Sequence, residues 1–519
     1  MSVSKRIAIA VTISWISRAI SIVSSLLLMP ILFRYMGKEE LGLWFLLGNS
    51  QAFLGLLGMG ITPTLTRRIA FAKGKSGSNP DAELTLESKQ DIGDWVVTGK
   101  IILQWLAVIV FFIAWISGYG LIRELKLEQV APQTVFWAWT LMCVGYSLNV
   151  WVSYLNCWLQ GIGYVGWDSV IGTGTAIITI LANIVAVLMG GGLLTLAIIS
   201  VASSILQRFV FLGFIRWRQP ELLQIKGRWN QEHAKSLVKP AMLHWLTDLG
   251  AFLILRTDAY FIAILKGVDN LPQYQATYSL ISNLYMLSVS MASASAVFVS
   301  QAWQADDLAL VQNLTFRNAQ IGLSLIAVGV SFVMISGENL INLWLGTGNF
   351  IGYSTLLVFC VMITLETQHV ILVSSSRATE DENYAPWALS AGVLNVIFTW
   401  LLIKPLGLLG VAMGTMLAQM LTNNWYAVYR PMKRLRLNFH DYLTQVVSWW
   451  ALLLITGYSL SWIFKQSLVL MNLKSDWLIV IGSGLINTIL FLSFLWHKII
   501  ADRQKILFIS KAKILLRLN

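Results

Sequence analysis

Long apolar segments follow one another along almost the whole chain, and they restrict its fold more than any other feature. A membrane-spanning helix needs about 20 apolar residues. Charged residues make up only 12% of the 519 residues, whereas soluble domains have about a quarter. We therefore expect an all-α polytopic membrane protein. The fourteen predicted spans are 7–33, 41–66, 95–118, 133–160, 166–189, 193–217, 237–265, 272–300, 317–337, 351–376, 386–404, 408–430, 441–465 and 476–498.

Lysine and arginine gather in alternate connections between these spans. With both termini on one side, the connections on that side carry 25 of them and those on the other side carry 8. Cytoplasmic loops carry the excess of basic residues, so we predict cytoplasmic termini and a multi-pass protein of a bacterial inner (plasma) membrane. The formal net charge of +12 follows from this topology, and we expect no nucleic acid partner.

The polar connections suggest how the chain is divided. We predict an N-terminal six-helix bundle over 1–217, a basic cytoplasmic linker over 218–236 and a C-terminal six-helix bundle over 237–430. Residues 431–519 would add two further transmembrane helices and a basic tail.

An internal repeat supports the two bundles. The stretch "LANIVAVLMGGGLLTLAIISVASSIL" (181–206) is similar to "LNVIFTWLLIKPLGLLGVAMGTMLAQML" (394–421) when Asn183 is matched to Asn395. In each copy an apolar half-helix leads to a glycine-bearing turn and then to a helix of small residues, which allow close helix contact. The alternative is a chance similarity between apolar segments.

A tight charged turn, "FRYMGKEELGLW" at 33–44, joins the first two spans, and we expect its charges to keep that turn in water. Together with "LGMGITPTLTRRIA" and the later "GLLGVAMG", it resembles the polysaccharide flippases, the Wzx-type exporters of the multidrug/oligosaccharidyl-lipid/polysaccharide (MOP) superfamily. The resemblance covers essentially the whole chain. It implies a MATE-like fold of about 14 helices, with two six-helix bundles around a central cavity and two C-terminal helices. One departure is Gly58-Met59-Gly60, where such proteins commonly carry an acidic residue.

The first span carries a polar stripe with an arginine in the middle. The stripe residues recur at i, i+4, i+7 and i+11 and so lie within roughly 60° of each other on a helix. An arginine fork suits phosphate oxygens, so one interpretation is that this stripe binds the pyrophosphate or acidic sugars of a lipid-linked glycan. The other is that the arginine reaches the membrane interface or pairs with an acid. The stripe comprises Ser14, Arg18, Ser21 and Ser25.

Other polar residues inside the spans give further candidates. In 237–265, ion coupling and structural pairing are both open interpretations for His244, Asp248 and Asp258; Glu366 and His369, at i and i+3 in a later span, are also candidates for ion coupling. Neutral polar side chains could bind sugar hydroxyls or only pack helices together. The remaining cavity candidates are Asn49, Gln51, Arg256, Gln275, Tyr278 and Ser282, whereas Arg208 and Arg377 fit interfacial positions better.

No catalytic constellation, metal-ligand spacing or nucleotide motif occurs, so we expect neither an enzyme nor a bound cofactor or metal. The leading hypothesis is export: a lipid-linked (undecaprenyl-pyrophosphate) oligosaccharide crosses the bilayer by alternating access. Its partners would be the glycan substrate, the lipid bilayer, a coupling proton or sodium ion and other polysaccharide-assembly proteins. The alternatives are a drug/cation antiporter of the same fold, a lipid II flippase and, less favoured, a membrane glycosyl polymerase or ligase.

Overall fold

The fold is known from a computed structural model of the chain. The structure describes residues 20, 23, 27–57, 61–74, 84–162, 164–218, 220, 227–304, 306–379, 381, 383–473 and 475–499. Every regular element within these ranges is helical, which confirms the expected all-α fold class.

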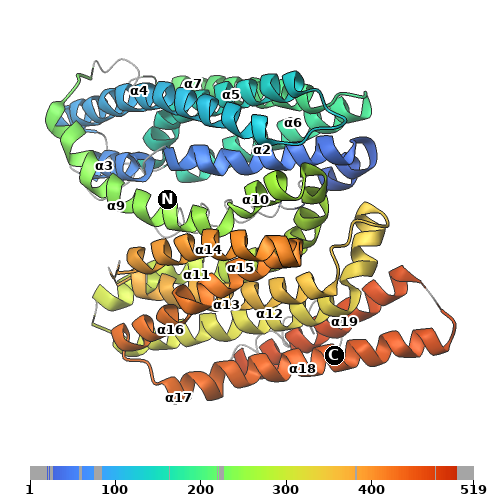
Figure 1. The fold of residues 1–519 in the computed structure, drawn as a ribbon. Helices are drawn as coiled ribbons and strands as arrows, with labels where there is room; N and C mark the ends of the chain where they lie inside the picture. Colours follow the sequence, from blue (N-terminus) through green and yellow to red (C-terminus); the bar gives the residue numbers. More distant parts are fainter. Residues whose placement is uncertain are drawn as a thin grey trace, which may run out of the picture. The chain divides into compact units, whose positions relative to one another are not determined.

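The chain forms two compact units that divide between Pro272 and Gln273. The domain boundaries expected from the spans remain predictions. Unit 1 contains α2 (Lys38–Leu57), α3 (Ile61–Gly74), α4 (Leu86–Glu124), α5 (Pro132–Gly161), α6 (Val165–Leu188), α7 (Leu193–Arg218), α9 (Gln231–Leu255), α10 (Asp258–Leu265) and η1 (Val268–Asn270) (Figure 1). Unit 2 contains α11 (Leu271–Gln304, which begins just before the division), α12 (Leu308–Leu345), α13 (Tyr353–Arg377), α14 (Ala385–Leu406), α15 (Leu408–Leu421), α16 (Asn423–Arg434), α17 (Phe439–Tyr442), η2 (Leu443–Val447), α18 (Ser448–Leu470), α19 (Asp476–Phe494) and η3 (Leu495–Ile499).

Nine helices in the described part of the chain are long and apolar enough to cross a bilayer, so the count of fourteen is not confirmed. Among the described residues, helix breaks divide the predicted spans 237–265 and 408–430. The span 237–265 breaks between α9 and α10, and 408–430 breaks at Thr422, whose φ of −126° and ψ of −77° are not helical. Both breaks fall at polar residues.

The two repeated segments both form helical hairpins. In unit 1, α6 and α7 pack against each other on either side of a short turn; in unit 2, α14 and α15 do the same. The second turn is a single residue, Gly407, at φ +61°, a conformation that costs glycine little. Asn395 is buried in its hairpin and accepts a hydrogen bond from the Thr415 hydroxyl at 2.9 Å.

The acidic residues of the charged segment 33–44 lie in the first turn of α2 and are not in a solvated loop, contrary to our expectation. Glu39 is only 6% exposed, and its carboxylate accepts hydrogen bonds of 3.0–3.2 Å from the backbone N–H groups of Glu128, Gln129 and Val130. Glu40 accepts a 2.7 Å bond from the N–H of Leu193, the first residue of α7. The two carboxylates therefore attach α2 to two distant connections of unit 1.

Helices α18 and α19 pack along α12 in unit 2 (Figure 1). Serine hydroxyls form hydrogen bonds between these helices. Ser331 donates to the Leu454 carbonyl of α18 at 2.9 Å, and the hydroxyls of Ser336 and Ser483 are hydrogen-bonded at 2.8 Å. Such hydrogen bonds contribute about 0.6 kcal/mol each between membrane helices. The last two helices are thus an integral part of unit 2.

Candidate functional site

A polar cluster in unit 1 lies where the chain breaks between α9 and α10. Arg256 caps the end of α9, and its Nη1 donates to the Asn49 side-chain oxygen of α2 at 3.2 Å. One turn further, the Tyr260 hydroxyl donates to Ser50 Oγ at 3.0 Å. The structure thus brings together Arg256 and Asn49, which the sequence suggested separately as cavity residues.

The charge of Arg256 remains available in this arrangement. Its side chain is exposed, and its described partner is a neutral amide rather than a carboxylate. Because guanidinium has five N–H donors, the bond to Asn49 orients the fork and leaves donors for another acceptor. An exposed, oriented guanidinium is suited to binding phosphate or carboxylate oxygens.

The same break changes the geometry expected around Asp258. Its alignment with His244 and Asp248 assumed one continuous helix over 237–265, but α9 ends at Leu255 and α10 begins at Asp258. A step of 100° per residue therefore cannot be carried from one helix to the other. Asp258 itself is half-buried and has an interaction partner.

Unit 2 holds a second polar cluster, at the break between α15 and α16. Glu366 of α13 accepts a 3.3 Å hydrogen bond from the Gln419 side chain of α15. His369, one turn along α13, faces the backbone of Asn423, the first residue of α16. A helix break next to a carboxylate is how many transporters build ion sites, because unwound carbonyls become available there.

Several polar atoms of this second cluster are buried and have no hydrogen-bond partner among the residues that the structure describes. They are Gln419 Oε1, His369 Nδ1 and both side-chain polar atoms of Asn424. Gln419 is 1% exposed and Asn424 9%. Unsatisfied acceptors around a carboxylate could bind a small cation or a proton, with oxygen ligands from Glu366 and Gln419. Within the described ranges, no group of three or more His, Cys, Asp or Glu residues could hold a metal ion.

The polar face of α11 is less open to ligands than its sequence suggests. The Tyr278 ring packs against Phe359 of α13 with centroids 5.4 Å apart, and the Ser282 hydroxyl donates to the Ser279 carbonyl of its own helix at 3.1 Å. Gln275 is half-buried on the same helix. These contacts are those of a face that packs against another helix, and sugar binding by this face remains a prediction.

Several of the candidates cannot be placed. Ser14, Arg18, Ser21 and Ser25 lie outside the described residues, as does Gly58-Met59-Gly60. Gln51, His244 and Asp248 belong to helices whose course is described, but their side chains are not among the described ones. Their proposed roles remain predictions.

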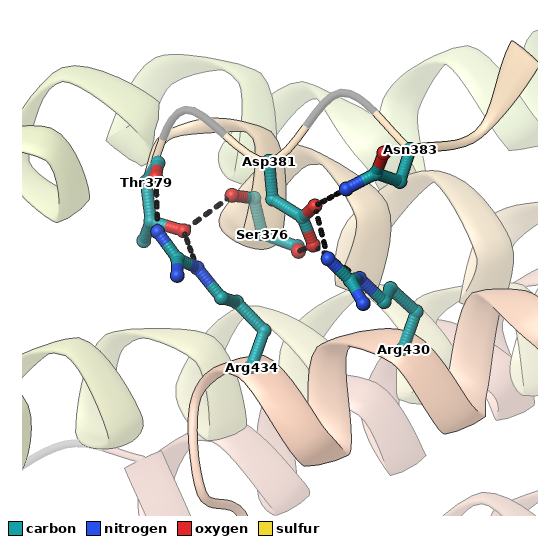
Figure 2. Close-up of polar contacts among 6 residues, drawn as sticks. All are labelled: Ser376, Thr379, Asp381, Asn383, Arg430 and Arg434. Carbon is teal, nitrogen blue, oxygen red and sulfur yellow. Dashed lines mark hydrogen bonds and ion pairs between the residues drawn. The ribbon is translucent and has the colours of Figure 1, made fainter.

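The strongest polar cluster in the described part of unit 2 was missed by the sequence reasoning. Figure 2 shows the connection between α13 and α14 held by two arginines of α16. Arg430 binds both carboxylate oxygens of Asp381 at 2.8 Å, and Arg434 donates to the Thr379 hydroxyl and carbonyl at 3.0 and 2.8 Å. Ser376 also donates to Asp381, at 3.0 Å. The only sequence signal was an acidic and a basic connection on the same predicted side.

The Asp381 carboxylate is therefore held in its charged form. Hydrogen bonds from Arg430 lower its pKa from 3.8 to about 2, although burial of the carboxylate opposes this. Arg434 is further fixed by the Trp303 ring, which lies 4.7 Å from its guanidinium carbon. Both arginines are engaged within unit 2, so we regard this cluster as a structural clasp.

Comparison with known proteins gives the fold. No protein-family model and no curated protein matches the chain. Among solved structures, lipid II flippase MurJ in an inward closed conformation matches with a TM-score of 0.69 and 14% identity, over 93% of this chain and 98% of that one. An inward-facing multidrug resistance MATE family transporter of the MOP superfamily has a TM-score of 0.64 and 14% identity, over 80% and 95%. MATE in complex with MaL6 matches with a TM-score of 0.59 and 14% identity, over 84% of this chain and 97% of that one. The chain is thus a multi-pass membrane protein with the fold shared by MurJ and MATE transporters.

Proposed function

We propose that this chain is a flippase that moves a lipid-linked oligosaccharide, carried on undecaprenyl pyrophosphate, from the cytoplasmic to the outer face of a bacterial inner membrane. The MurJ structure, which is that of a flippase, matches 93% of the chain, whereas the MATE structures match 80–84%. The extra matched length favours a flippase over a drug antiporter. Movement would occur by alternating access between the two units.

Arg256 is the observation that carries this proposal. Its guanidinium is exposed, oriented by Asn49 and not neutralised by that partner. A drug/cation antiporter would present a carboxylate to its cationic cargo, whereas an exposed arginine favours an anionic one. We assign Arg256 to the pyrophosphate or to an acidic sugar of the cargo, together with Arg18, whose place in the site remains a prediction from sequence.

Coupling to a proton or sodium ion is assigned to the cluster of Glu366 and His369. The neighbouring helix break and the unpartnered oxygen of Gln419 support this assignment. Glu366→Gln keeps the shape of the side chain and removes its charge. We expect it to abolish the dependence of transport on a proton or sodium gradient, measured in proteoliposomes with imposed gradients; an unchanged dependence would return Glu366 to a packing role.

The function is tested by deleting the gene in its host and following the glycan. Loss of surface polysaccharide with accumulation of the lipid-linked oligosaccharide on the cytoplasmic leaflet is the expected result. The wild-type gene should restore export and Arg256→Ala should not, whereas the control Arg216→Ala, at the exposed end of α7, should. Normal surface glycan in the deletion strain would contradict the proposal.

Two alternatives have distinct outcomes in the same strains. Because the matching MurJ structure is that of a lipid II flippase, rescue of a strain depleted of its own lipid II flippase would assign that substrate instead. Increased drug susceptibility with unchanged glycans would indicate an antiporter. A membrane glycosyl polymerase or ligase would leave glycans short on the outer face rather than trapped inside.

A further inference from the structure

Arg208 of α7 occupies an unusual position inside unit 1. Its guanidinium carbon lies 3.9 Å from the centroid of the Trp151 ring of α5. Two polar atoms of these residues, Arg208 Nη1 and Trp151 Nε1, are buried and have no hydrogen-bond partner among the described residues. The same is true of Ser147 Oγ, one turn before Trp151 on α5. Two of the three groups can only donate hydrogen bonds, and the hydroxyl of Ser147 can do so as well.

Arg208 points into the helix bundle rather than towards lipid. On α7 it follows the buried Ala197 and Ser204 at spacings of 11 and 4 residues, which places all three within about 40° on the helix. The exposed apolar face of α7 is a different one, because it carries Ile205 and Phe209, which are 42% and 66% exposed. The sequence-based expectation of an interfacial arginine therefore does not account for its contact with Trp151.

The polar groups on α5 form a continuous stripe towards this arginine. Ser147, Trp151, Tyr154 and Trp158 recur at i, i+4, i+7 and i+11, so they lie within about 60° of one another. Tyr154 faces the Arg208 charge, and Trp158 Nε1 is likewise buried with no hydrogen-bond partner in the described part of the chain. The stripe offers aromatic rings and hydrogen-bond donors together.

No acidic side chain balances the Arg208 charge within these helices. Helices α5, α6 and α7 carry one carboxylate between them, Asp168, and its Oδ2 accepts a 2.7 Å bond from Gln160 instead. Arg208 lies ten residues before the end of α7, which corresponds to about 15 Å along the helix. The Arg208 side chain is half-buried and its Nη1 atom is shielded from solvent. Leaving a charged donor buried without a partner costs free energy, which an anion bound there would recover.

We infer that Arg208, Trp151 and Ser147 form a binding site for an anionic oxygen group, a phosphate or a carboxylate, inside the N-terminal unit. The oxyanion accepts hydrogen bonds from the guanidinium, the indole and the hydroxyl, while the Trp151 face keeps the guanidinium in place. The site does not depend on the proposed function, because the oxyanion can belong to a phospholipid headgroup or to a soluble or transported molecule.

Binding is tested with the full-length protein in nanodiscs, and its thermal unfolding midpoint is the readout. One arm adds inorganic pyrophosphate to nanodiscs of phosphatidylcholine alone; the other replaces part of that lipid with phosphatidylglycerol. The variants are Arg208→Gln, Arg208→Lys, which keeps the charge without the fork, and Trp151→Phe, which keeps a ring without the donor. The control is Arg218→Gln, since Arg218 also stacks on a tryptophan of α7, Trp217 at 4.4 Å, but at its exposed end.

We expect the wild type and Arg218→Gln to be stabilised equally in at least one arm. Arg208→Gln should weaken the apparent affinity about tenfold to a hundredfold, because a hydrogen bond to a charged group contributes about 1.5–3 kcal/mol. Stabilisation by pyrophosphate assigns the site to a soluble or cargo oxyanion, and stabilisation only by phosphatidylglycerol assigns it to a headgroup. If Arg208→Gln does not fold, the inference is tested by Arg208→Lys and Trp151→Phe, which should likewise be stabilised less than the wild type. An equal response in wild type and Arg208 variants, or no response of the wild type in either arm, overturns the inference.

Discussion

Replacing Asp381 by asparagine tests whether the clasp in unit 2 stabilises the fold. The substitution preserves the size of the side chain but removes the charge that Arg430 binds through two 2.8 Å hydrogen bonds. It also leaves the Arg430 fork facing an amide that can accept from only one of its two terminal atoms. We expect the connection between α13 and α14 to lose its attachment to α16.

The size of the effect follows from the pKa of Asp381. A decrease from 3.8 to about 2 corresponds to about 2.4 kcal/mol in favour of the charged form, because one pKa unit equals about 1.36 kcal/mol. The side chain is 3% exposed, so solvent screens this interaction little. Since the pKa is lowered on folding, the contribution is fully present above pH 3.8 and is lost as the pH falls through about 2. The loss in Asp381→Asn should therefore be constant between pH 5 and 8.

Thiol labelling on heating gives a readout confined to unit 2. All three cysteines are buried, and Cys360 lies on α13, so a Cys143→Ala/Cys157→Ala background leaves one reporter there. A loss of about 2.4 kcal/mol lowers the midpoint by roughly 5–10 °C. Asp441→Asn, in the short helix α17, is the control because Asp441 has no described ion pair. A shift below about 2 °C, or an equal shift in the control, would refute the reasoning.

Two further substitutions test contacts in unit 1. Glu39→Ala should destabilise the unit by about 3 kcal/mol, because three backbone N–H groups lose a charged acceptor, whereas Glu128→Ala, on an exposed side chain whose N–H is retained, should not change the unfolding midpoint. Gly227→Ala would bring a Cβ to 2.1 Å from the Gly93 carbonyl oxygen, so the linker should detach from α4 and become sensitive to limited proteolysis; Gly213→Ala, with no atom within 4 Å, should leave the digestion pattern unchanged.

The sequence was sufficient for the fold class and for the repeated hairpins because both depend on local patterns. Long apolar runs exclude everything but helices in a membrane, and the segments around Asn183 and Asn395 each form the helical hairpin that the alignment implied. Gly407 separates the two helices of its hairpin at a positive φ, which glycine adopts at little cost, and a glycine between two apolar runs is visible in the sequence.

Local sequence patterns did not predict the contacts between residues that are far apart in the sequence. Glu39 binds backbone groups 89 to 91 residues away, and backbone N–H donors leave no mark in a sequence. Asp381 and Arg430 are 49 residues apart, and the sequence alone predicts ordinary solvated charges at both positions. The break at Thr422 was missed because polar residues also occur inside membrane helices, so Thr422 and the two asparagines after it do not by themselves mark a non-helical residue.

The partner of each arginine decides what else it can bind. Arg430 faces a carboxylate at 2.8 Å, so an anionic ligand would have to displace a charge already in place. Arg256 is held by the neutral side chain of Asn49 and is exposed, so its full charge acts on whatever approaches. Arg208 lies over Trp151, which orients the guanidinium without neutralising it. Neutral partners fix the geometry of a cation at little cost to its charge, and that is why Arg256 and Arg208, rather than the better-bonded Arg430, are the arginines we assign to anionic ligands.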